Sequence, residues 1–482
     1  MSASPANKPQ SGPASSHGQP DGQADRIDPQ IWKIACAVML APLMSQLDST
    51  VVNVSLSTLA TDLHTTLITI QWVSSGYLLT MALTLPLSGW LVDRLGAKRV
   101  YLCCFSLFTL ASLLCGLATS AGSLILFRVL QGMAGGVLTP MSQMMMARTA
   151  GRHMARVMGI AVMPVMLGPI FGPTVAGLIL QHAGWPWIFL INLPIGALAL
   201  LLAWYVLPAD THLRVRRDFD LLGFVLLSPG LALLLHSLET LAGADQGGDW
   251  VRWELPGSLV LLVLFLLHSK RRAGTALIDI RLFGTRTFSA SAATQFMSNC
   301  MTYGGQLLFP LYLITVLGYT PSRAGILLAA MGLGLVCMGP LMGRLIGRYG
   351  ARRVSAGGAI VGLVGTMPFM LVGTYQMPDV VICLLLWLRG IGMASINIPS
   401  MSSAYADIPK QRLPVATTAL NIAQRLGGPV ATTGLAIWLH ASKDVHPTQT
   451  ATAFSSTFGM LCLVHALGVL AALRLPSGRR RA

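Results

Sequence analysis

Long apolar runs recur along the chain and predict membrane-spanning helices. The runs are roughly 20 residues long, enough to cross a bilayer core of about 30 Å. Because lipid offers no partners for backbone N–H and C=O groups, such spans have to be helical. The pattern predicts fourteen spans, near residues 31–57, 69–90, 99–119, 122–146, 154–181, 187–207, 219–239, 253–269, 287–317, 322–343, 353–374, 379–402, 413–440 and 450–474.

The composition agrees with this pattern. The chain is 54% hydrophobic and only 10% charged, whereas soluble proteins carry about 25% charged residues. We therefore predict an all-α polytopic membrane protein. Residues 1–30 are rich in Pro, Ser, Gly and Gln and contain no apolar core, so we expect a disordered cytoplasmic tail and no cleavable signal peptide.

The net charge of +16 could indicate nucleic-acid binding, but its distribution indicates a membrane topology. With the N-terminus in the cytoplasm, the tails and even-numbered loops hold 27 of the 33 Lys and Arg residues. This asymmetry follows the positive-inside rule and places both termini in the cytoplasm. The exceptions are Arg252, Arg323 and Lys443 in odd-numbered loops, and Arg128, Arg389 and Arg425 inside spans.

An internal repeat divides the chain into two related halves. Residues 89–100 read GWLVDRLGAKRV and residues 343–354 read GRLIGRYGARRV, with seven of twelve positions identical. FRVLQGMAGGVLTP from Phe127 is echoed more weakly by LRGIGMASINIP from Leu388. Such repeats are typical of secondary transporters, whose substrate site lies at the repeat interface. We expect a tail at 1–30, a first half at 31–207, a linker with two inserted helices at 208–286, a second half at 287–474 and a basic tail at 475–482.

Asp48 is the strongest candidate for chemistry. It lies 15 residues beyond Lys33, roughly 22 Å along a helix and near the middle of the bilayer. A charge there is costly and normally faces a cavity or a partner. We expect Asp48 to bind and release a proton, since poor solvation disfavours its ionised form; it could also attract cationic substrates. The alternative is a structural hydrogen-bond anchor that never titrates.

Arg128, inside the fourth span, is the obvious partner for Asp48. An arginine is effectively always protonated and needs a counter-charge. Breaking the pair during a transport cycle would load or release the proton. The alternative is a fixed salt bridge between the first and fourth spans, although buried pairs are in themselves weak evidence for stability.

Five motifs stand in successive predicted spans and loops. They are Leu47-Asp48-x-Thr50-Val51-Val52-Asn53-Val54, Gly89-x-x-x-Asp93-Arg94-x-Gly96-x-Lys98-Arg99, Arg128-x-x-Gln131-Gly132, Gly159 with Gly168-Pro169-x-x-Gly172-Pro173, and Trp187-Ile188-Phe189-x-Ile191-Asn192-x-Pro194-Ile195-Gly196. These motifs resemble those of the major facilitator superfamily, and within it the fourteen-spanner drug:proton antiporters, and they occur at the spans where that family has them. Two positions depart from the pattern: Pro186 stands where the family usually has Arg, and Gly347 stands where the first loop has Asp93.

The resemblance implies roles for these motifs. The fourth-span Arg128 would handle protons. The loop residues Gly89, Asp93, Arg94, Gly96, Lys98 and Arg99 would lock the cytoplasmic side; the alternative is a simple basic turn. The fifth-span residues Gly159, Gly168, Pro169, Gly172 and Pro173 would form a bendable seam between the halves, or serve packing alone. The central cavity would be lined by the first, fourth, ninth and twelfth spans, with candidate polar groups at Asn53, Gln131, Asn299, Tyr303, Asn397, Asn421, Gln424 and Arg425.

Other activities lack their motifs. No Gly-Lys dipeptide occurs, so an ATP-binding P-loop is excluded, and the scattered His and Cys residues predict neither a metal site nor an enzyme. We expect a proton-driven exporter of hydrophobic or amphipathic drugs in a bacterial inner membrane, without cofactor or nucleic-acid partner. The alternatives are a dedicated exporter of one metabolite or siderophore, and a non-transporting receptor or assembly subunit. The sequence does not identify a periplasmic adaptor or outer-membrane channel.

Overall fold

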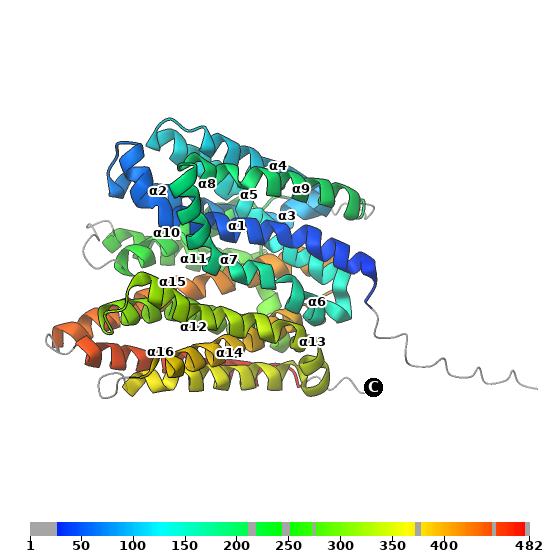
Figure 1. Cartoon of the computed structure of the whole chain (residues 1–482). Coiled ribbons are helices and arrows are strands. Elements are labelled where there is room, and N and C mark those ends of the chain that lie inside the picture. The colour runs from blue at the N-terminus through cyan, green and yellow to red at the C-terminus, as the bar shows by residue number, and fades with distance from the viewer. Residues whose placement is uncertain are drawn as a thin grey trace, which may run out of the picture.

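The computed structural model describes residues 27–210, 218–242, 251–272, 276–371, 377–445 and 450–477, and these residues build a bundle of long helices (Figure 1). The helices that precede residue 208 gather on one side of the bundle. They are α1 (Pro29–Asp62), α2 (Leu67–Thr84), α3 (Leu87–Leu95), α4 (Ala97–Gly116), α5 (Ala121–Ala150), α6 (Met154–Ala161), α7 (Met163–His182), α8 (Pro186–Leu190) and α9 (Asn192–Val206), with a 3-10 turn at Gly151–His153.

The helices that follow residue 285 gather on the other side (Figure 1). They are α12 (Arg286–Thr315), α13 (Pro321–Thr366), α14 (Asp379–Ala406), α15 (Leu413–Val445) and α16 (Thr450–Leu473), with 3-10 turns at Ile280–Gly284, Met367–Leu371 and Lys410–Arg412. The insertion contributes α10 (Leu221–Ala242) and α11 (Val251–Arg271). Most of the predicted N-terminal tail, part of the linker and most of the basic C-terminal tail lie outside the described residues.

Every predicted span falls on helix, although several spans are broken. Ten helical segments of the described chain are long and apolar enough to cross a membrane, and one of them, Pro321–Leu371, covers two predicted spans. The other predicted spans coincide with α12, with α15 and with the pair α6 and α7. The shortest predicted span, 253–269, is among the ten, as α11.

Proline explains where the fifth span breaks. We expected one helix over 154–181, but the helix is interrupted at Val162, two residues before Pro164. Proline has no N–H to donate and restricts the residue before it, so the helix restarts there as α7. A similar break between α2 and α3 lies at Leu85 and Pro86.

The repeated loops have the same backbone geometry. Gly96 joins α3 to α4 with φ 95° and ψ 152°, and Gly350 bends α13 with φ 78° and ψ 156°. A positive φ of this size strains any residue with a side chain, which accounts for glycine at both positions. The sequence repeat is therefore also a repeat of structure.

Helix α10 lies against both groups of helices. Trp72 of α2 stacks on His236 of α10 with ring centroids 5.9 Å apart. On the other side, Thr433 of α15 donates to the carbonyl oxygen of Leu238 at 2.5 Å. Helix α11 packs mainly on α10 and exposes a row of aliphatic side chains, as expected for a lipid-facing helix: Leu259, Val260, Val263, Leu264, Leu266 and Leu267.

Among the described residues, one buried hydrophobic cluster joins the two groups of helices, and it lies at one end of the bundle. We call this end, which carries the repeated basic loops, the basic-loop end. There, one buried cluster contains Met144 and Met158 of the first half together with Met342 and Leu420 of the second. Two other clusters each stay within one half, around Phe189 in the first and around Phe309 and Phe458 in the second. The halves are therefore packed together at the basic-loop end.

Candidate functional site

The structure places Arg128 directly against Asp48. Nη1 of Arg128 lies 2.5 Å from Oδ2 of Asp48, and both side chains are fully shielded. Nε of Arg128 donates to the carbonyl oxygen of Val73 at 3.0 Å. The guanidinium also lies over the ring of Tyr77, 4.2 Å from its centroid. The two candidate residues therefore form one buried ion pair that joins α1, α2 and α5.

Two amides complete the surroundings of the carboxylate. Gln131 accepts from Nη1 of Arg128 at 2.7 Å and donates from Nε2 to Oδ1 of Asp48 at 3.2 Å. Asn192, at the start of α9, donates to Oδ1 of Asp48 at 2.9 Å and to Oγ of Ser112 at 3.0 Å. Asp48 thus accepts three hydrogen bonds, an arrangement suited to an ionised carboxylate.

Close packing of the backbones makes this cluster possible. A Cβ at Gly132 of α5 would lie 2.5 Å from the carbonyl oxygen of Tyr77, so glycine allows α5 to approach α2 closely. On the other side of α1, Gly168 and Gly172 of α7 face Gln46 and Thr50, the neighbours of Asp48. Pro169 and Pro173 also fall in α7.

Only one glycine of the fifth-span motif contacts the other half directly. A Cβ added at Gly159 of α6 would overlap the carbonyl oxygen of Gly339 in α13, and the reverse also holds. Gly168 and Gly172 pack within the first half instead, against α1. The expected seam between the halves is therefore carried by Gly159, because α6 is the part of the broken span that meets α13.

The basic loop contacts the second half through α3. Gly89 lies so close to α15 that a Cβ there would be 3.3 Å from the carbonyl oxygen of Pro414. The neighbouring Ser88 hydrogen-bonds Thr418 at 2.8 Å. Gly343, the equivalent of Gly89 in the second repeat, packs closely on α6 of the first half, where an added Cβ would lie 2.6 Å from Cβ of Arg156. The two repeats thus close the basic-loop end by matching contacts.

Lys98 and the backbone of Arg99 form their hydrogen bonds within the first half. Nζ of Lys98 donates to the carbonyl oxygens of Trp204 and Leu207 at 2.6 and 2.9 Å, at the end of α9. Asp210 accepts from the backbone N–H of Lys98 at 3.0 Å and of Arg99 at 3.1 Å, and so fills the anion site at the start of α4.

The remaining loop residues lie beside these contacts. Arg94 is exposed, with its guanidinium 5.4 Å from the Trp90 ring centroid. Asp93 is half-buried in α3, and Asp93 and Asp210 both interact electrostatically with Arg148 of α5.

The predicted cavity residues do not form one group. Gln131 belongs to the Asp48 cluster, and the exposed Asn53 accepts from Ser74 Oγ at 2.6 Å. Asn421 donates to Gln143 Oε1 at 2.7 Å across the two halves. Asn299 and Asn397 are half-buried among the helices of the second half, and Tyr303 is 45% exposed and packs on Gly428. Oε1 of Gln424 is buried and has no hydrogen-bond partner among the described residues, and the neighbouring Arg425 contacts Met81.

Sequence reasoning assigned no role to Asn192, Ser112, Asp210 or Thr418. Asn192 stands inside one of the motifs, but nothing in its spacing places it beside Asp48. The meeting of Asn192 and Asp48 depends on how α9 packs on α1, which the sequence pattern leaves open.

Two packed groups of helices, a structural repeat and a buried ion pair define a polytopic membrane transporter. The chain belongs to the Major Facilitator Superfamily, whose model matches residues 38–432, and the predicted all-α fold and family are confirmed. It is 34% identical to the Multidrug resistance protein B homolog of Mycobacterium tuberculosis H37Rv over 439 residues, 90% of this chain and 80% of the relative.

A second relative and two solved structures are also similar to this chain. The chain is 32% identical over 460 residues to an Escherichia coli K12 protein provisionally named multidrug resistance protein MdtD, covering 93% of this chain and 94% of the relative. The fold of this chain resembles that of the proton:xylose symporter XylE, with a TM-score of 0.63 and 15% sequence identity, over 92% of this chain and 95% of the symporter. The fold of this chain also resembles that of the human organic anion transporter MFSD10, with a TM-score of 0.61 and 16% sequence identity. The match covers 91% of this chain and 100% of that transporter.

Proposed function

We propose that this protein is a proton-coupled antiporter that exports hydrophobic or amphipathic compounds. The observation that carries the proposal is the buried Asp48–Arg128 pair, in which one carboxylate accepts hydrogen bonds from three side chains. A helix bundle that does not transport protons would be expected to have apolar residues at these positions, because the desolvation penalty of a buried charge pair usually offsets its electrostatic attraction. The names of the two relatives support the drug-export part of the proposal.

The proposed cycle couples the ion pair to rocking of the halves. In the described conformation the basic-loop end is packed shut, by Ser88 with Thr418 and by Gly159 with Gly339. A proton that reaches Asp48 from the opposite side neutralises the carboxylate and weakens its hold on Arg128. The halves then rock, so that the basic-loop end opens and the opposite end closes. The proton leaves at the basic-loop end as substrate is taken up there.

The charge distribution supports an orientation. The basic-loop end would face the cytoplasm, with both termini there, because the Lys and Arg residues concentrate in those loops and tails. The proposed location is a bacterial inner membrane. Protons and small amphipathic molecules are the partners, and the proton gradient alone drives export without a cofactor.

Everted membrane vesicles with an acidic interior test the proposal. Dyes and biocides that are substrates should dissipate the pH gradient in vesicles containing the native protein, and Asp48→Asn should abolish the response. Asp62→Asn is the matched control, because Asp62 is an exposed aspartate at the end of the same helix. Equal dissipation by the native protein and Asp48→Asn would contradict a proton role for Asp48.

A further inference from the structure

A single face of α15 supplies successive contacts to the first half. Thr418 bonds Ser88 of α3, Asn421 bonds Gln143 of α5, and Arg425 contacts Met81 of α2. Spacings of three and four residues place all three on one side of a helix. Arg425 lies twelve residues into α15, so it is roughly 18 Å from the start of the helix. It is therefore a charge near the middle of the membrane, just beyond the closed basic-loop end.

Arg425 has no acidic partner in the part of the chain that the structure describes. Its Nη2 donates to the sulfur of Met81 at 3.4 Å, and thioether sulfur is a weak acceptor. A guanidinium stays protonated at any physiological pH, so this site carries a permanent positive charge.

The other two intramembrane arginines are enclosed. Arg128 is paired with Asp48 and completely buried. Arg389 is also completely buried, held by the hydroxyl of Thr366 at 2.7 Å, by Nε2 of His465 at 3.2 Å and by the carbonyl oxygen of Met301. Arg425 alone among the three is partly accessible.

Asp48 is poorly placed to attract a cationic substrate. It is 1% exposed, and both of its oxygens are engaged by Arg128, Gln131 and Asn192. The sequence analysis left open that Asp48 attracts cationic substrates, but the partly accessible Arg425, which contacts Met81 of the other half, is positively charged. In a medium of low polarity this charge favours an anion strongly.

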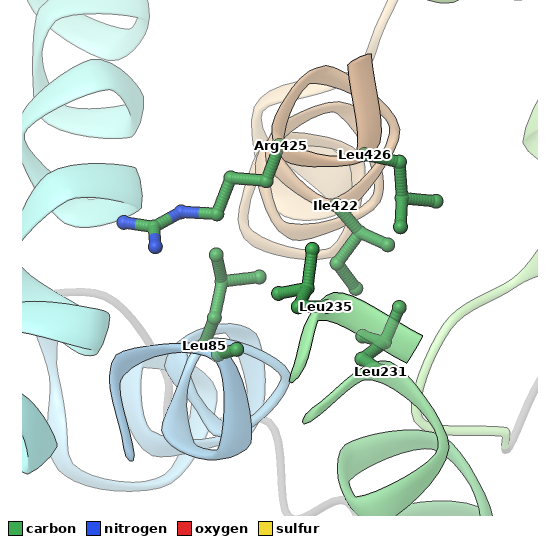
Figure 2. Close-up of a pocket in the computed structure, with 7 residues that line it drawn as sticks. Leu85, Leu231, Leu235, Ile422, Arg425 and Leu426 are labelled. Carbon is green, nitrogen blue, oxygen red and sulfur yellow. The ribbon is translucent and has the colours of Figure 1, made fainter. Parts of the chain in front are cut away.

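The surroundings of Arg425 are otherwise apolar. A small cavity of about 10 Å³ adjoins it, lined by Ala82, Leu85, Leu231, Leu235, Ile422 and Leu426. Figure 2 shows the guanidinium on the side of Leu85, directed away from Leu231 and Leu426. Helix α10 of the insertion thus forms one wall. The cavity has room for about one water molecule, so a substrate would bind here only when the halves separate further.

We propose that Arg425 binds the anionic group of the transported compound, while Leu85 and the leucines of α10 and α15 receive its apolar part. The substrates would therefore include lipophilic carboxylates and sulfonates. This inference rests on the proposed export function for its physiological meaning, but the binding site is testable without transport.

A matched pair of aromatic probes with opposite charges tests the site. We would measure binding of 2-naphthalenesulfonate and of (2-naphthyl)trimethylammonium to the purified full-length protein by equilibrium dialysis. The native protein should bind the sulfonate at least about tenfold more tightly, and Arg425→Gln should lose that factor while binding of the ammonium stays the same or improves. Arg425→Lys should retain most of the sulfonate affinity, and Arg281→Gln, an exposed arginine far along the chain, should retain all of it.

A second variant keeps the arginine in place. Met81→Glu sets a carboxylate beside Arg425 and should abolish sulfonate binding, whereas Met81→Gln should not. The inference would be overturned if the native protein bound the ammonium more tightly or did not bind the sulfonate. It would also be overturned if sulfonate binding were unchanged in Arg425→Gln. Displacement of the sulfonate by added phosphatidylglycerol would assign the site to a lipid phosphate instead.

The two proposals fail in different ways. Sulfonate binding that depends on Arg425, with no pH response in vesicles, would remove the antiport function and keep the anion site. A pH response that depends on Asp48, is elicited by cations and is unchanged in Arg425→Gln would keep the antiport function and remove the anion site.

Discussion

Asn192 of α9 donates a hydrogen bond to Asp48 of α1 at 2.9 Å, deep inside the first half of the protein. The same amide nitrogen donates to Ser112 of α4 at 3.0 Å. A side chain outside the ion pair therefore orients the carboxylate that we propose to carry the proton, and it links three helices around it.

Asn192→Ala should destabilise the protein. It removes a donor from two buried acceptors, Asp48 and Ser112, and unsatisfied buried groups cost about 1–3 kcal/mol. Thermal unfolding in detergent, followed by intrinsic tryptophan fluorescence, would measure the loss. Asn53→Ala is the matched control, since Asn53 is exposed on α1 and its loss should change stability by less than about 0.5 kcal/mol. Equal effects of the two variants would argue against a structural role for Asn192.

Removing one member of the ion pair should cost more than removing both. Arg128→Met leaves Asp48 buried without its cation, a change typically worth about 3–5 kcal/mol. The double variant Asp48→Leu with Arg128→Met should recover most of that stability and still be unable to couple protons. Unfolding and vesicle assays on the same three proteins would test this. A double variant as unstable as Arg128→Met would mean that the pair itself stabilises the fold.

Gly159→Ala should disturb the contact between the halves. Its new methyl group would meet the backbone carbonyl of Gly339, which cannot move aside as a flexible side chain can. Overpacking of this kind costs about 1–3 kcal/mol. We expect lower transport and lower thermal stability. Gly177→Ala in α7 is the control, because a Cβ there meets no atom within 4 Å, and similar behaviour of the two variants would count against the seam.

Asp220 gives a prediction about pH. It lies just before α10, where burial raises the pKa of its carboxyl, but hydrogen bonds from His268 and from the backbone N–H groups of Gly223 and Leu277 outweigh that effect and leave the pKa below its ordinary value of 3.8. A lowered pKa in the folded state means stability that is full above pH 3.8 and is lost as the pH falls through the folded value.

Asp220→Asn should therefore be less stable than the native protein near neutral pH. The difference should shrink in acid below the ordinary carboxyl pKa, where the native Asp220 is also protonated. Thermal unfolding as a function of pH would measure it, with the exposed Asp62→Asn as control. A difference that grows as the pH falls would have the wrong sign.

The sequence predicted more of the fold than of the site's detail. The apolar runs located the spans because lipid demands long apolar helices, and Asp48 stood out because a carboxylate is costly in that setting. Asn192, Asp210 and Thr418 were not recognised, because their roles arise from contacts between helices distant in sequence. Lys98 was expected to help lock the cytoplasmic side; the motif did not indicate that its ammonium group binds the carbonyl oxygens at the end of α9.

Proton binding by Asp48 is the central claim, and it can be measured without knowing the substrate. Proteoliposomes adsorbed on a solid-supported membrane would be exposed to a sudden step to lower pH. The native protein and Asp62→Asn should give a transient current as protons bind, and Asp48→Asn should give none. The same transient current in Asp48→Asn as in the native protein would contradict the claim and leave Asp48 as a structural anchor for Arg128.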